Sequence, residues 1–188
     1  MNIPNSLTLI RILLIPVFIV VFYLPYKWSH LLAAAVFTLA AVTDLLDGYL
    51  ARKLGQISKL GAFLDPVADK LMVAVVLVLL VQQHPSIWLA LPAAVIIGRE
   101  ITVSALREWM AELGARRKVA VSFWGKFKTV LQMIALILLI YREPLFGLPI
   151  YETGMVALYI AAILTLWSML QYLYLAWPEL SSKKNINP

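Results

Sequence analysis

The sequence contains no cysteine and only two histidines among its 188 residues. The lack of cysteine excludes disulfide bonds and thiolate chemistry. His30 and His84 each lack a partner at the spacing of metal ligands, so we assign neither of them a function. The first apolar stretch lacks a basic leading region and a small-residue cleavage site, so we expect no cleavable signal peptide.

Apolar residues, by contrast, are abundant: 62% of the chain is hydrophobic, against about 45–50% in a typical soluble domain. This composition excludes an ordinary soluble protein. A membrane-spanning helix needs about 20 mostly apolar residues. Because the connections are short, we expect one all-α domain over residues 1–188, a polytopic membrane helical bundle. Its six predicted spans are at roughly 7–24, 31–52, 62–82, 86–109, 119–141 and 150–175.

The N-terminal residues 1–10 are too polar to span a membrane. Their cap-like, turn-prone start predicts a short N-terminal interfacial helix that leads into the first span, with Pro16 as a kink. Asn5, Thr8 and Arg11 follow one another at i, i+3 and i+6 on one broad helix face. This face either belongs to a functional site, or Asn5 caps the helix and Arg11 extends to lipid headgroups.

The net charge of +6 follows the predicted topology and does not indicate a nucleic acid partner. The loops at one end of the spans carry clusters of Lys and Arg, whereas those at the other end carry only Lys27 and Arg142. By the positive-inside rule, we expect both termini and the basic loops in the cytoplasm. Anionic membrane lipids are expected partners of that face. The basic residues are Arg52, Lys53 and Lys59, then Arg116, Arg117 and Lys118, then Lys183 and Lys184.

Four aspartates interrupt the second and third predicted spans near the cytoplasmic boundary. Asp44 and Asp47 are spaced i, i+3, and Asp65 and Asp69 are spaced i, i+4, so each pair lies on one helix face. Ionisable groups in membrane helices are costly and mark a functional site by default. Neighbouring carboxylates repel one another, and Mg²⁺ or Mn²⁺ would relieve that repulsion because these ions take oxygen ligands. Ordinary boundary charge is the alternative, but a solvated loop needs no helical spacing.

A second polar cluster is predicted on the cytoplasmic halves of the fourth and fifth spans. Lys126 and Lys128 are about 200° apart on a helix, so both cannot point into the same pocket. We favour Arg107 with Lys126 as an anion site. Arg99 can instead pair with Glu100 or an aspartate, and Lys128 can extend to headgroups. Such a basic pocket suits a phosphate-bearing acceptor, because Arg binds phosphate bidentately and Lys binds it as a point charge.

The aspartates belong to a longer motif, Asp44-x2-Asp47-Gly48-x2-Ala51-Arg52-x8-Gly61-x3-Asp65-x3-Asp69. This motif resembles the signature of the CDP-alcohol phosphotransferase family at every specified position. The resemblance implies a membrane enzyme that moves a phosphatidyl or other phospho-alcohol group from a CDP donor to an alcohol and releases CMP. It also implies two divalent ions at the donor's diphosphate, a homodimer, and a place in the bacterial cytoplasmic (inner) membrane.

The resemblance also implies roles for the four aspartates. Asp44, Asp47 and Asp65 would be metal ligands, and Asp69 would be the general base, close to the second metal ion. Elementary chemistry agrees, because a hydroxyl nucleophile needs its proton removed and a carboxylate within hydrogen-bond reach can do that.

On the donor side, the resemblance implies that four further residues approach CDP-diacylglycerol. Arg52, with Gly48 and Gly61, would meet the cytidine diphosphate, and Asn5 would lie close to the nucleotide. Glycine suits such a position because it lets a ligand approach the backbone closely.

The acceptor is not encoded by the family signature. A wider resemblance to family members that use sn-glycerol 3-phosphate covers nearly the whole chain. It is carried by residues 2–11, 63–70, 98–100 and 125–129. It implies that CDP-diacylglycerol and sn-glycerol 3-phosphate give phosphatidylglycerol phosphate and CMP. Inositol phosphate or phosphatidylglycerol are alternative acceptors, and inositol phosphate would also need the basic pocket.

From a different class of protein, a small cation transporter would also place aspartates inside a membrane. Against this reading, all four aspartates lie at one boundary, and the distal halves of the spans carry no ionisable path. The second half of the chain also shows no inverted repeat of the cluster. Release of CMP from CDP-diacylglycerol would distinguish the enzyme from the transporter.

Overall fold

The computed structural model describes residues 3–54, 59–112, 123–145 and 147–181. Within these ranges, the side chains of residues 3–4, 47–52, 54, 59–60, 62, 112, 123–127 and 178–181 are not described. Of the predicted site residues, Asp47, Gly48, Arg52 and Lys126 are therefore placed by their helix alone.

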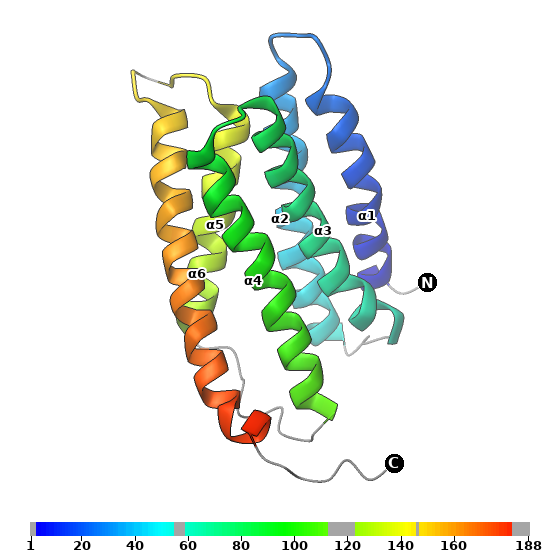
Figure 1. Cartoon of the computed structure of the whole chain (residues 1–188). Coiled ribbons are helices and arrows are strands. Elements are labelled where there is room, and N and C mark those ends of the chain that lie inside the picture. Colours follow the sequence, from blue (N-terminus) through cyan, green and yellow to red (C-terminus); the bar gives the residue numbers. More distant parts are fainter. Residues whose placement is uncertain (1–2, 55–58, 113–122, 146, 182–188) are drawn as a thin grey trace.

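The described residues form an all-helical bundle, as the sequence predicts. Its helices are α1 (Ile3–Phe22), α2 (Ser29–Leu54), α3 (Lys59–Gln83), α4 (Ile87–Glu112), α5 (Phe123–Tyr141) and α6 (Ile150–Ser181). The helices run side by side, and α1 begins at the same end of the bundle at which α6 ends (Figure 1). Pro25, Pro85 and Pro149 lie in the connections at the opposite end. Proline suits these connections because it has no backbone N–H to continue the hydrogen bonds of a helix.

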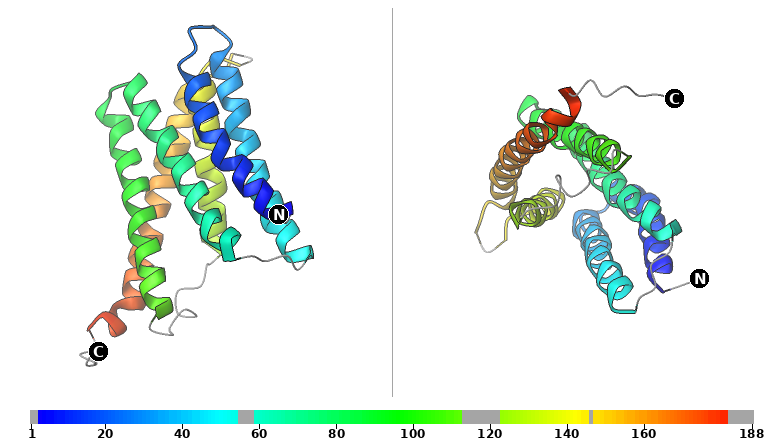
Figure 2. Two further views of the ribbon diagram at one scale, coloured as in Figure 1. Left: turned by 90° about the vertical axis from the view of Figure 1, so that its right-hand side faces the viewer. Right: turned by 90° about the horizontal axis from the view of Figure 1, so that it is seen from below.

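The helices pack in a ring whose order differs from their order in the chain. Around the bundle, each helix contacts the next in the order α1, α2, α5, α6, α4 and α3, and α3 returns to α1. Figure 2 shows this arrangement along the bundle axis. Helix α3 also touches α5 across the ring. The ring therefore brings α1, α2 and α3 together at one side and α4, α5 and α6 at the other.

Helices long and apolar enough to cross a membrane account for four of the six predicted spans. Helix α5 adds a shorter apolar stretch, Lys128–Tyr141. The predicted interfacial helix is not a separate element in the described residues, since α1 is continuous from Ile3 and contains Pro16. The four qualifying segments are Asn5–Phe22, Ser29–Leu46, Ile87–Ala111 and Ile150–Trp177.

Apolar side chains fill the bundle and also cover its outside. Phe18, Phe37, Val76 and Leu136 are buried in the main core, to which all six helices contribute. The outer surface carries large apolar side chains in every described helix, including Trp167, which is 64% exposed. Helices that are apolar on all sides suit a lipid environment, in which the inner faces pack and the outer faces meet acyl chains.

Helices α5 and α6 pack closely together at Gly154. A Cβ atom at this position would lie 3.0 Å from Leu139 Cγ. Small residues commonly permit such close packing between membrane helices. This tight contact fixes α5 against α6 and so helps to place the polar residues further along both helices.

Candidate functional site

Three of the four aspartates come together near one end of the bundle. Asp44 of α2 and Asp69 of α3 line one small cavity, together with Arg11 of α1. The carboxylate of Asp44 also lies close enough to that of Asp65 for the two to repel each other. The structure thus brings Asp44, Asp65 and Asp69 to one place from α2 and α3, which lie on either side of α1 in the ring.

Helix α1 supplies a partner to one aspartate of each pair. The Thr8 hydroxyl donates a hydrogen bond to Asp65 Oδ1 at 2.8 Å. Arg11 forms an ion pair with Asp44, with 2.5 Å between Nη1 and Oδ1. Both Thr8 and Arg11 are 1% exposed. Arg11 therefore does not extend to the lipid headgroups, and the face of α1 that carries it meets the aspartates.

The sequence placed Thr8 and Arg11 on one face of a helix but gave neither a partner. Their spacing of three residues, about one helical turn, indicates that both side chains lie on one face of the helix. The spacing does not indicate which helix that face contacts. Only the packing of α1 against both α2 and α3 shows that this face meets the aspartates.

The donor set fits a hard divalent cation in its chemistry. Carboxylate oxygens are the ligands that Mg²⁺ and Mn²⁺ prefer. No group of three acidic or histidine side chains among the described residues is arranged to hold a metal ion by itself. Asp47, which follows Asp44 by about one turn of α2, has a side chain outside the described set. The predicted metal site therefore rests on Asp44, Asp65 and Asp69 with the Asp47 position beside them.

Of the four residues predicted to meet the CDP donor, two are described in full and two by their helix alone. Gly61 lies in the first turn of α3, one turn before Asp65, and Asn5 lies on α1 one turn before Thr8. The backbones of Gly48 and Arg52 belong to the last two turns of α2. These helix ends lie at the aspartate end of the bundle, on the side where α1 begins (Figure 1).

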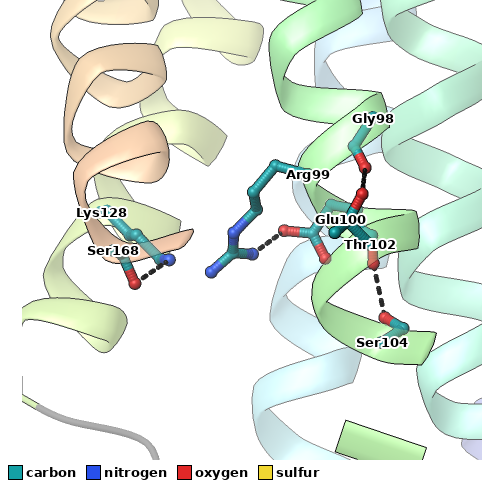
Figure 3. A network of polar contacts seen from close by, with 7 residues as sticks. All are labelled: Gly98, Arg99, Glu100, Thr102, Ser104, Lys128 and Ser168. Carbon is teal, nitrogen blue, oxygen red and sulfur yellow. Dashed lines mark hydrogen bonds and ion pairs between the residues drawn. The ribbon is translucent and has the colours of Figure 1, made fainter. Parts of the chain in front are cut away.

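A second polar cluster lies between α4, α5 and α6. Arg99 of α4 pairs with Glu100, and the Arg99 side chain is 10% exposed. Lys128 of α5 is 3% exposed, and its Nζ donates a hydrogen bond to Ser168 Oγ of α6 at 3.0 Å. Figure 3 shows the Arg99 guanidinium extending from α4 toward the Lys128–Ser168 pair. Two cations from different helices therefore face one region inside the bundle.

Two further buried polar residues lie one helical turn from Lys128 on α5 and from Ser168 on α6. Gln132 follows Lys128 by one turn, and Thr165 precedes Ser168 by one turn; both are buried. Within the described part of the chain, the Arg99 Nε atom and the Thr165 hydroxyl have no hydrogen-bond partner. Buried polar groups are normally satisfied, so unpaired donors here are consistent with a region that receives a polar ligand.

The sequence analysis favoured Arg107 and Lys126 as the anion site, but the described cations inside the bundle are Arg99 and Lys128. Arg107 is exposed, and its guanidinium carbon lies 6.0 Å from the centroid of the Tyr172 ring. Lys128 is buried and does not extend to headgroups. The side chain of Lys126 is outside the described set. Arg99 does pair with Glu100, one of the alternatives that the sequence left open, and still points toward Lys128.

The opposite end of the bundle holds a third polar cluster. Arg142, at the end of α5, donates a hydrogen bond to His84 Nε2 at 2.9 Å and another to His30 Nε2 of α2. The His84 ring lies 5.5 Å from the ring of Tyr151 in α6. Burial, followed by the charge of Arg142, lowers the pKa of His84. The two histidines to which the sequence gave no function therefore share one arginine, across about half the chain.

Comparison with known proteins supplies the remaining observation. The model of the CDP-alcohol phosphatidyltransferase family matches residues 1–167. A Pseudomonas fluorescens protein named CDP-diacylglycerol–glycerol-3-phosphate 3-phosphatidyltransferase is 61% identical over 183 residues, covering 97% of this chain and 93% of that protein. The Escherichia coli K12 protein of the same name is 54% identical over 179 residues, covering 95% of this chain and 97% of that protein. A third, from Sodalis glossinidius, is 55% identical over 180 residues, covering 96% and 97%.

Proposed function

The chain belongs to the CDP-alcohol phosphatidyltransferase family, and from this premise we propose its reaction. It transfers the phosphatidyl group of CDP-diacylglycerol to sn-glycerol 3-phosphate, giving phosphatidylglycerol phosphate and CMP. The enzyme is thus a phosphotransferase of phospholipid biosynthesis. The observation that supports this most strongly is the identity of 53–61% to bacterial proteins that carry the name of this activity, over nearly the whole chain.

The aspartate cluster is the proposed catalytic centre. Asp44, Asp47 and Asp65 would hold two divalent ions, Mg²⁺ or Mn²⁺, with Asp69 beside the second. Such ions, when bound, neutralise the charge that develops at the donor's diphosphate. These three aspartates would ligate the ions. Helix α1 holds Asp65 through Thr8 and Asp44 through Arg11.

Asp69 is the proposed general base. It lines the same cavity as Asp44, and a carboxylate there can accept the proton of the glycerol hydroxyl as that oxygen attacks phosphorus. The proton moves to a carboxylate oxygen of Asp69, the new oxygen–phosphorus bond forms, and CMP leaves with the electron pair of the broken phosphorus–oxygen bond. The apolar lining around the cavity, which includes Phe37 and Met72, limits access of competing water.

Donor and acceptor would approach from different sides of this centre. Asn5, Gly48, Arg52 and Gly61 would contact the cytidine diphosphate, and the acyl chains would lie in the bilayer. The acceptor phosphate would bind the cluster between α4, α5 and α6, where the buried Lys128 and the facing Arg99 are the strongest candidates.

Lys126 and Arg107 complete the proposed basic pocket. Lys126 precedes Lys128 by two residues on α5 and is proposed as a further cation for the acceptor phosphate. Arg107 lies two turns after Arg99 on α4 and stacks on Tyr172. We assign Arg107 to the mouth of the pocket, where an exposed cation attracts the phosphorylated acceptor without burying it.

All six helices are proposed to span the bacterial inner membrane, with the active site and both termini in the cytoplasm. The Lys/Arg bias between the two sets of loops supports this orientation. Single cysteines report sidedness cleanly because the natural chain has none. Position 56 should resist membrane-impermeant thiol reagents in intact cells, whereas position 27 should react; external labelling at 56 would reverse the orientation. We also propose a homodimer, by resemblance to the family.

The reaction is tested with purified protein, CDP-diacylglycerol and a panel of acceptors, by measuring CMP. We expect release of CMP with sn-glycerol 3-phosphate, and little with inositol phosphate, phosphatidylglycerol or serine. Excess EDTA should abolish the release, and added Mg²⁺ or Mn²⁺ should restore it. Full activity in EDTA would contradict the metal site, whereas CMP release with inositol phosphate alone would keep the family and change the acceptor.

A further inference from the structure

We propose that α1 sets the distance between the two aspartate pairs, with Thr8 and Arg11 as positioning residues for the metal centre. The inference rests on the proposed function, because it concerns how the aspartates are held for their ions. Thr8 contacts Asp65 of α3, and Arg11 contacts Asp44 of α2. One helix thus touches one aspartate from each pair.

The two contacts come from adjacent turns of a single rigid element. Thr8 and Arg11 are three residues apart on α1, so their side chains emerge about one turn apart on the same face. The four aspartates are divided between α2 and α3, and α1 packs against both helices, so the spacing between the two pairs depends on how each helix is held against α1. Two contacts to one helix fix that spacing, because the distance between the α1 side chains is itself fixed by the helix.

The rotation of α1 about its axis is set by aromatic packing further along the same face. Phe18 lies seven residues after Arg11, which is two turns along the same face. The Phe18 ring packs against Phe22 of α1, at 5.7 Å between centroids, and against Phe37 of α2, at 6.4 Å. Phe18 and Phe37 are both essentially inaccessible to solvent. This apolar contact turns the face of α1 that carries Thr8 and Arg11 toward the aspartates.

Each contact uses a single carboxylate oxygen, Oδ1. A carboxylate has two oxygens that can accept or ligate, so a partner on one oxygen orients the other. Groups that hydrogen-bond to metal-ligating carboxylates in this way usually affect metal affinity by about 10- to 100-fold when they are removed. Arg11 also places a buried positive charge beside Asp44, which reduces repulsion among the carboxylates.

A purely architectural role is the competing explanation. In that case Thr8 would only satisfy a buried hydroxyl, and its loss would lower the stability of the bundle without changing its affinity for metal. Stability and metal affinity therefore have to be measured separately, on the full-length protein in detergent and without substrate. Binding of Mn²⁺, followed by electron paramagnetic resonance of the free ion, reports affinity directly, and thermal unfolding in EDTA reports stability.

The deciding variants are Thr8→Val and Thr8→Ser. We expect Thr8→Val, which keeps the shape and removes the hydrogen bond to Asp65, to weaken Mn²⁺ binding by about tenfold or more. Thr8→Ser, which keeps the hydroxyl, should retain nearly natural affinity. Should Thr8→Val fail to fold, Thr8→Ala serves in its place, with the same expected loss. Arg11→Lys, which keeps the charge and loses the planar fork, should also weaken binding.

Thr38→Val is the matched control. Thr38 is on α2, and its hydroxyl donates to the Ala34 carbonyl within the same helix, away from the aspartates. It should leave Mn²⁺ affinity unchanged. Equal affinity in the natural protein, Thr8→Val and Arg11→Lys would overturn the positioning role and leave the metal site intact. Failure of the natural protein to bind Mn²⁺ at all would instead overturn the metal site, and this inference with it.

Discussion

Both ends of the bundle hold an arginine between helices, but the partners have opposite chemistry. Arg11 pairs with the Asp44 carboxylate at one end, whereas Arg142 contacts two imidazoles at the other. The carboxylates outnumber the cation beside them, so that cluster still has negative charge to offer a metal ion. The imidazoles accept hydrogen bonds only when neutral, so the Arg142 cluster has no negative charge to offer a cation.

The Arg142 cluster connects more parts of the bundle than one helix and its neighbour. Arg142 joins α2, the connection after α3, and α5, and His84 continues the contact to Tyr151 of α6. Arg142 also has a positive φ of 49°, a conformation that costs free energy in a residue other than glycine. Its hydrogen bonds hold it there. We interpret the Arg142 cluster as a clamp between helices, and the aspartate cluster as the reactive end.

The largest expected effect separates these two roles. Asp44→Asn and Asp65→Asn should each remove nearly all transfer activity, at least about a hundredfold, because an amide cannot replace a charged metal ligand. Arg142→Gln, at the other end, should leave the activity of the folded protein close to natural. CMP release per folded enzyme measures both. Comparable losses at the two ends would show that the clamp also shapes the active site.

Asp69→Asn should lower turnover by about 10²-fold or more, since an amide cannot accept the proton of the nucleophile. Binding of CDP-diacylglycerol should fall less than it does in Asp65→Asn, if Asp69 acts chiefly in deprotonation. The measurement is kcat at saturating substrates, beside a direct binding assay for the donor. An equal loss of donor binding in both variants would make Asp69 a metal ligand first.

The basic cluster between α4, α5 and α6 should govern the acceptor alone. Arg99→Met and Lys128→Met keep most of the side-chain volume and remove a charged contact to phosphate, worth about 1.5–3 kcal/mol. The KM for glycerol 3-phosphate should therefore rise roughly tenfold to a hundredfold, with the donor KM little changed. Arg107→Met is the comparison, and its smaller effect should match its exposed position. A rise only in the donor KM would place these residues on the other substrate.

The smallest expected effect is the pH dependence of the clamp. The pKa of His84 is lowered from 6.5 by burial and by Arg142, so the unfolded chain takes up a proton first as the pH falls. Stability from this contact is present above about pH 6.5 and is lost below it. The melting temperature should thus drop more between pH 7.5 and 5.5 in the natural protein than in His84→Gln. His30 faces the same arginine, so some dependence remains; an unchanged drop would exclude His84.

The aspartate pairs show how far local spacing reaches. The i, i+3 and i, i+4 intervals predict two faces on two neighbouring helices, and the structure brings Asp44, Asp65 and Asp69 together there. Spacing works here because the partners lie on consecutive helices joined by a short connection. The basic cluster was harder, because Lys128 meets Ser168 forty residues later in the chain. No periodicity within α5 indicates which side of it faces α6 and which faces lipid, since both are apolar.

Composition and spacing alone therefore determined that this chain is an apolar helical bundle with an acidic motif near one end. These are local properties, because the cost of burying charge and the helical repeat act within a few residues. Tertiary structure decided which helix faces meet. Packing places Thr8 and Arg11 against the aspartates. It also points Arg99 toward Lys128, and it lets Arg142 contact both His30 and His84. Each of these contacts joins residues far apart in the chain, and in helices that are apolar on every side only the order of packing selects them.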